Sequence, residues 1–294
     1  MATQTVPPTW WSPRQIVSFM DTHPQRAYFS RFFRDGGFRS GMEVGVAGGR
    51  FSEHFLMDNA GIGAWDWTMM EPYPNKNFLS RYPQLAQSVA NATLRRQYES
   101  RSQGKDSPKS WRARGIGGNA RLQFVHALST DTSALEVTSA SKYAFIYLDG
   151  AHDYVNVKRE LFAYWPKVAP GGVLAGHDYC VQPSKPPREK PWIQPGQTEA
   201  PLPLKCRGCA SIPGCGVYTE YAEGKRGAVA KSQEGVVRAV QEWLAEAHPK
   251  LMLHHTRENF TAASLKADGM PYELIITKSR NPSWFVIKAP RKAL

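Results

Sequence analysis

Two apolar runs joined by an amphipathic segment constrain the fold of this chain more than any other feature of its sequence. The runs are YAFIYLDG at 143–150 and VLAGHDY at 173–179, and the segment 155–168 between them has the apolar spacing of a helix. An unbroken apolar run is typical of a parallel strand that is buried on both faces. A strand, a helix and a second strand in this order predict a parallel sheet.

The same alternation extends over most of the 294 residues. Residues 41–60 have the pattern of a strand, a glycine turn and a helix, and residues 234–247 that of a second helix. Pro170-Gly171-Gly172 is expected to turn into the strand at 173. The fold class predicted from this alternation is α/β, a doubly wound, mostly parallel sheet with helices on both faces. Further strand patterns lie at 66–72, 121–127, 251–255, 272–277 and 284–288.

The chain divides into a short first segment and one large domain. Residues 1–39 are rich in aromatic side chains and predict a helical cap, with Ser12 as N-cap and Pro13 at the first helical position. Residues 40–294 are expected to form the main domain. Two insertions interrupt it: a basic one at 94–118 and a proline- and cysteine-rich one at 180–233, which we expect to be a lid.

The charge of the chain suggests an anionic partner, but its distribution does not favour nucleic acid. The formal net charge is +12, and many of the basic residues fall in the insertion at 94–118. The sequence contains no run of eighteen apolar residues, so no membrane span is predicted, and no apolar signal segment is visible. A soluble, cytoplasmic protein is favoured, and the secretory lumen stays open if an N-terminal anchor was removed. The oligomeric state is not predicted.

The four cysteines cluster in the second insertion, which indicates that they act together. A structural zinc site, two disulfides and free thiols all fit the spacing, and the sequence does not separate them. The residues are Cys180, Cys206, Cys209 and Cys215.

A glycine-rich turn follows the strand pattern near residue 43. Gly45, Gly48 and Gly49 lack side chains and would let a ligand approach the backbone closely. Their spacing is not that of a pyrophosphate-binding fingerprint, which favours a cofactor without phosphates. Glu71 ends the next strand pattern, where an acid typically accepts the hydroxyls of a ribose. Together these residues predict an adenosine site.

The stretches EVGVAGGRF, MEP and FIYLDGAHDYVNVKRELFAYWPKVAPGGVLAGHDY resemble the motifs of class I S-adenosylmethionine-dependent methyltransferases. The last stretch is most similar to the branch of macrocin-type sugar O-methyltransferases. The resemblance covers roughly 40–180 and the closing helix and strands from 234, and it does not cover 1–39 or the two insertions. It implies a seven-stranded, Rossmann-like methyltransferase sheet with helices on both faces, and S-adenosylmethionine as cofactor.

Carried over by position, the resemblance implies roles for individual residues. Glu43, Gly45 and Gly48 would line the methionine and adenosine pocket, and Glu71 would bind the ribose. Ser129 would lie near the adenine, although an ordinary strand-end cap fits Ser129 as well.

The same resemblance places a metal at the ends of the fourth and fifth strands. Asp149 and Asp178 would hold a divalent cation, with magnesium expected, and Asp149 would also border the cofactor. His177 departs from the acid or amide of the metal-dependent relatives, and imidazole is a poor magnesium ligand. His177 or His152 is therefore a candidate general base, because the ordinary pKa of histidine lies near neutrality.

These features predict an enzyme that methylates a hydroxyl of a sugar or another small polar acceptor, assisted by a divalent metal. Two alternatives remain open at this point. One is an RNA or protein methyltransferase that uses the basic surface, and the other is a non-catalytic protein that binds the cofactor with the same fold.

Overall fold

The computed structural model describes seven parts of the chain: residues 10–74, 119–138, 143–179, 206–207, 234–256, 267–269 and 282–290. The predicted basic insertion at 94–118 and the predicted strand at 272–277 lie outside them. So does the lid at 180–233 apart from residues 206–207, of which only the backbone is described. Of the four cysteines, Cys206 has its backbone in the described part, and the zinc, disulfide and thiol alternatives concern side chains that the structure does not describe.

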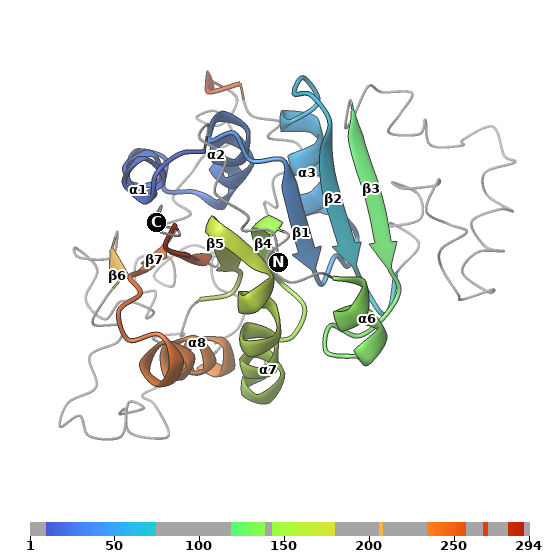
Figure 1. Ribbon diagram of the computed structural model, residues 1–294, viewed down its shortest axis with the longest axis vertical. Helices are drawn as coiled ribbons and strands as arrows, with labels where there is room; N and C mark the ends of the chain where they lie inside the picture. Colours follow the sequence, from blue (N-terminus) through green and yellow to red (C-terminus); the bar gives the residue numbers. More distant parts are fainter. Residues whose placement is uncertain are drawn as a thin grey trace, which may run out of the picture.

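The described strands form one mixed sheet in the order β3-β2-β1-β4-β5-β8-β7-β6 (Figure 1). The pairs from β3 to β5 are parallel, and β8 lies antiparallel between β5 and β7. This confirms the Rossmann-like class, with the two-residue β6 added beside β7. The bounds are β1 (Ser40–Val44), β2 (Trp65–Met70), β3 (Ala120–Val125), β4 (Tyr143–Leu148), β5 (Val168–Gly176), β6 (Cys206–Arg207), β7 (Leu253–His255) and β8 (Trp284–Ile287).

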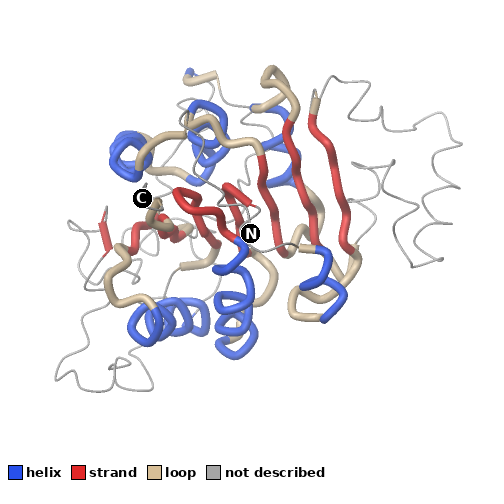
Figure 2. The backbone as a smooth tube through the Cα atoms, in the orientation of Figure 1, coloured by secondary structure: helices blue, strands red, loops and turns tan. Residues whose placement is uncertain are grey.

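Helices cover both faces of the sheet, as Figure 2 shows in the same view. One apolar cluster joins α1, α2 and α3 to the sheet, and a second joins α6, α7 and α8 to the opposite face. Burial of these clusters is the main stabilising contribution to the fold. The helices are α1 (Pro13–Thr22), α2 (Phe29–Asp35), α3 (Arg50–Asp58), α6 (Thr132–Val137), α7 (Tyr154–Tyr164) and α8 (Glu234–Ala247), with 3-10 turns η1 (Arg26–Tyr28) and η4 (Trp165–Lys167).

The N-terminal cap begins as its sequence predicts. The Ser12 hydroxyl accepts from the Gln15 backbone N–H, the Gln15 side chain returns to the Ser12 backbone N–H, and Pro13 opens α1. The cap is not one continuous helix, because α1 ends at Thr22 and Pro24 follows. Proline disfavours helical backbone in the residue before it, so the chain restarts at η1.

Strand β5 begins earlier than the sequence predicts. Pro170-Gly171-Gly172, expected as a turn, lies within Val168–Gly176, and the pairing with β4 shifts register between Tyr143 and Phe145. Gly171 has φ +81°, which explains the glycine at this irregularity. The expected turn is an irregularity in the pairing inside the strand.

In the described part of the chain, the helices are all too short or too polar to cross a membrane.

Candidate active site

The site lies where the order of the sheet reverses. The chain runs outward from β1 to β2 and β3, then returns to β4 on the other side of β1. Open α/β sheets bind ligands in the crevice beyond such a reversal. Gly45 follows β1 there at φ +84°, and a Cβ on it would lie 2.2 Å from the Cα of Gly150. Only glycine permits this close crossing of the two loops.

The glycine turn after β1 is fixed by the acid at the end of β2. Ala47 and Gly49 both have positive φ, and Gly49 is the N-cap residue of α3. The buried carboxylate of Glu71 accepts from the backbone N–H of Ala47 at 2.7 Å and from that of Tyr73 at 2.8 Å. A carboxylate has about four acceptor positions, so Glu71 keeps capacity for ribose hydroxyls. The structure thus joins Gly45, Gly48 and Glu71 in one cradle.

Glu43 lies beneath α3 rather than at the open edge. Its buried carboxylate accepts from the hydroxyl of Ser52, which in turn accepts from the indole N–H of Trp67 at 2.7 Å. Burial raises the pKa of Glu43 well above its usual range, and the nearby carboxylates of Asp149 and Glu71 raise it further. Glu43 is therefore protonated over a wider pH range than an exposed glutamate.

Ser129 is held by α7. Its hydroxyl donates to Glu160 Oε1 at 2.6 Å, and its carbonyl accepts from the Tyr164 hydroxyl at 2.7 Å. Glu160 was not predicted, although its place on the apolar face of α7 could have revealed it. Burial raises the pKa of Glu160 to about 7, with smaller contributions from Asp153 and Asp149.

The raised pKa of Glu160 predicts that replacement by Gln removes a pH-dependent loss of stability. In the folded protein this carboxyl ionises near pH 7 instead of 4.5, so the wild type loses stability as the pH rises through that window. Glu160→Gln keeps the acceptor for Ser129 and carries no charge. Relative to wild type, the variant should therefore gain about 2 kcal/mol in its free energy of unfolding between pH 5 and pH 8.

Urea unfolding of the cofactor-free protein at both pH values measures this difference. Glu136→Gln, at an exposed position on α6, is the matched control. If wild type and Glu160→Gln change stability equally between pH 5 and pH 8, the carboxyl is not held protonated.

The strand ends of β1, β4 and β5 are joined by backbone hydrogen bonds that bring the predicted acids together. The N–H of Asp149 donates to Val44 at 2.8 Å, and that of His177 donates to Leu148 at 3.0 Å. The Nδ1 atom of His177 then lies 3.0 Å from Asp178 Oδ1 and 3.3 Å from Asp149 Oδ1. The two acids thus share one imidazole.

His152 joins this cluster from the loop before α7. Its Nδ1 lies 3.1 Å from Asp178 Oδ2, and its side chain is 47% exposed. One ligand atom from each of Asp149, His152 and Asp178 can be chosen so that all lie within 4.8 Å of one another. Two carboxylates and an imidazole at this separation fit a divalent cation.

Asp178 adopts a left-handed backbone conformation, with φ +58°. This conformation is uncommon outside glycine and is tolerated best by Asn and Asp. It lies directly after β5, and the Asp178 carboxylate contacts both His152 and His177. An Asp at this position can therefore end β5 while its carboxylate contacts both imidazoles.

Arg26 is a site residue that sequence reasoning missed. It lies in η1 of the N-terminal cap, is 2% exposed, and its Nη1 donates to His177 Nε2. The contact spans residues 26 to 177, and no local pattern in the sequence indicates it. The cap therefore contributes a cation to the cluster of acids.

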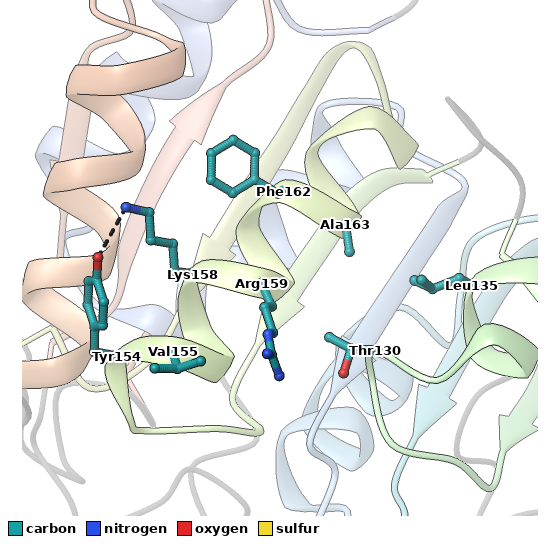
Figure 3. Close-up of a pocket in the computed structure, with 8 residues that line it drawn as sticks. All are labelled: Thr130, Leu135, Tyr154, Val155, Lys158, Arg159, Phe162 and Ala163. Carbon is teal, nitrogen blue, oxygen red and sulfur yellow. Dashed lines mark hydrogen bonds between the residues drawn. The ribbon is translucent and has the colours of Figure 1, made fainter.

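A separate cavity of about 630 Å³ lies between α6 and α7 and contains none of the predicted site residues (Figure 3). It is bordered by the exposed side chains of Val155 and Phe162. Lys158 lines it as well, and donates to the Tyr154 hydroxyl at 3.1 Å and to Glu242 of α8 at 2.8 Å. The bond to Glu242 ties α7 to α8, which accounts for the charged Lys158 at the border of this cavity.

Residues 42–179 match a family described as a methyltransferase domain. Among curated proteins, the comparison found no match.

Two of the solved structures to which this chain is similar are both methyltransferases by name. The O-methyltransferase from Bacillus cereus in complex with SAH is 14% identical, with 96% of this chain and 84% of that chain covered and a TM-score of 0.41. The N-methyltransferase NodS from Bradyrhizobium japonicum is 10% identical, with 94% and 98% covered and a TM-score of 0.37.

Proposed function

Because residues 42–179 match a family described as a methyltransferase domain, we propose that the chain is a class I S-adenosylmethionine-dependent methyltransferase that methylates a hydroxyl of a sugar or another small polar molecule. The observation that supports this acceptor class is the cluster of Asp149, His152 and Asp178 beside the cofactor cradle. A hydroxyl must lose its proton during methyl transfer. These residues provide two carboxylates and an imidazole at the carboxyl edge of the parallel strands, where the cofactor cradle lies.

The cofactor cradle supports a defined arrangement of S-adenosylmethionine. Glu71 would accept the ribose hydroxyls, and the turn at Gly45 and Gly48 would leave room for the adenosine and the methionine chain. Ser129 would border the adenine. Glu43 would border the methionine end from below, since it is close enough to Asp149 and Glu71 for their charges to raise its pKa. When bound, the cofactor supplies an activated methyl group.

A divalent cation fits between Asp149 and Asp178, with magnesium as our first choice. When bound there, it would lower the pKa of an acceptor hydroxyl and fix the oxygen. Asp149 and Asp178 would hold the acceptor oxygen through the bound cation. The contacts of both carboxylates with His177 would maintain the distance between the two aspartates.

We place the general base at His152 rather than His177. Both ring nitrogens of His177 are engaged, Nδ1 with the two aspartates and Nε2 with Arg26. His152 is half-exposed, so an acceptor can reach its ring, and Asp178 orients the ring through Nδ1. His152 would therefore take the proton that the acceptor hydroxyl loses.

The ribose role predicts that Glu71→Gln weakens S-adenosylmethionine binding by roughly 10–100-fold, because a charge-assisted hydrogen bond is replaced by a neutral one. Isothermal titration with the cofactor and with its demethylated product measures the loss. Glu136→Gln, away from the cradle, should bind as the wild type does. Binding of NAD by the wild type with equal affinity would contradict the cofactor assignment.

Mass spectrometry tests the acceptor class. The protein is incubated with isotopically methyl-labelled S-adenosylmethionine, magnesium and pools of sugars and other small polyols, and products are examined for labelled methyl ethers. Labelled amines or labelled RNA in parallel pools, without labelled ethers, would overturn the proposed acceptor.

A further inference from the structure

Arg26 is a buried cation that comes from outside the methyltransferase domain. The family match begins at residue 42, whereas Arg26 lies in η1 of the N-terminal cap. A buried charge is costly unless it is paired, so its position beside His177 requires an explanation.

The 3-10 turn that carries Arg26 is held rigidly against α3. The carbonyl of Ala27 accepts from His54 Nε2 at 2.8 Å and from the Ser30 hydroxyl at 2.9 Å. Asn59 donates to the carbonyl of Ser30 at 3.2 Å. Ala27, Ser30, His54 and Asn59 are all buried. Arg26 is thus presented from a fixed backbone, which is the support that an orienting residue needs.

Arginine is always protonated and can only donate, so Nε2 of His177 must accept the hydrogen bond from Arg26. The proton of neutral His177 is then on Nδ1, where it faces Asp149 and Asp178 at 3.3 and 3.0 Å. Guanidinium, imidazole and the two carboxylates thus contact one another in this order. Each member fixes the orientation of the next.

We propose that Arg26 is a positioning residue: it fixes the ring orientation and tautomer of His177, and His177 in turn sets the spacing of Asp149 and Asp178. The N-terminal cap therefore completes the active site. The effect on catalysis rests on the proposed function, while the effect on the His177 ring does not.

The direct test is the nitrogen NMR spectrum of the His177 ring in ¹⁵N-labelled cofactor-free protein at a pH where the imidazole is neutral. The expected wild-type signature is a protonated Nδ1 and an unprotonated Nε2. In Arg26→Met, which removes the charge and keeps much of the buried volume, proton density should move toward Nε2. A wild-type ring protonated at Nε2 would overturn the proposal without any variant.

Kinetics with an acceptor found by the mass-spectrometry experiment provide the second readout. Arg26→Met should lower kcat roughly 10–100-fold, as is usual when a residue that orients metal-binding side chains is lost, with the KM for S-adenosylmethionine nearly unchanged. Arg26→Lys should recover part of kcat because it restores one donor. Arg34→Met, in the same cap but paired with Asp35 and Asp58, is the control and should behave as wild type.

The outcomes separate this inference from the proposed function. If no hydroxyl acceptor is found, the proposed function fails, and the NMR spectrum still decides the role of Arg26. If Arg26→Met keeps both kcat and the wild-type tautomer, the residue is only structural. Should Arg26→Met fail to fold, the wild-type spectrum and Arg26→Lys decide, since an unchanged kcat and a protonated Nε2 in Arg26→Lys would refute the positioning role.

Discussion

Replacing Asp178 by Asn is expected to lower methyl transfer roughly 10³-fold, because several kcal/mol of metal assistance would be lost. Asn suits the left-handed backbone at this position, so the fold should be retained. The neutral amide is a weaker ligand for a hard cation and no longer pairs with His152 and His177 as a carboxylate does. Cofactor affinity should change little, because Asp178 lies outside the adenosine cradle.

Single-turnover rates with magnesium and calorimetric titration of the cofactor measure the two parts of this expectation. Asp153→Asn is a matched control, since Asp153 is exposed and caps α7, and Asn is an equally good cap. Full turnover by Asp178→Asn would make Asp178 an ordinary turn residue. If the wild type turns over after exhaustive chelation, with no metal restored, a cation is not needed for methyl transfer and the side chains act without one.

Replacing Gly45 by Ala is expected to reduce the free energy of unfolding by about 3–5 kcal/mol, since both strain and overlap are introduced. The new Cβ would sit 2.2 Å from the Cα of Gly150 on a backbone with φ +84°. The nearest atoms that this Cβ would meet all belong to the backbone of Asp149 and Gly150, so no flexible side chain can move aside. The loops after β1 and β4 would separate, so cofactor binding should be lost as well.

Urea unfolding and cofactor titration test this prediction on the same samples. Gly61→Ala is the control, because its added Cβ meets nothing within 4 Å and it has no positive φ. A Gly45→Ala protein as stable as Gly61→Ala would show that the close crossing of the two loops is not required.

Local patterns were sufficient to predict the parallel half of the sheet and the composition of its edge. Apolar runs at β4 and β5 required burial on both faces, and parallel strands end at the same edge, which brought Asp149 and Asp178 together. The glycine turn before α3 and the acid after β2 followed from the same reasoning.

Residues whose role depends on packing between distant segments were not predicted. Arg26 reaches His177 only because η1 packs on α3, and Ser129 meets Glu160 only after α7 docks on the sheet. The start of β5 was misplaced because a proline and two glycines usually mark a turn, and pairing with β4 overrides that local preference. Which nitrogen of His177 accepts a bond is likewise a property of the assembled fold.

The antiparallel strand β8 has a consequence for how a nascent chain assembles on the ribosome. Strands β1 to β5 are complete once residue 176 has been made, but β5 gains its second neighbour only when residues 284–287 follow. At common rates of translation this interval lasts on the order of ten seconds. The bare edge of β5 can pair with another chain during that time. Chaperone demand during synthesis should therefore peak in this interval and fall when β8 inserts.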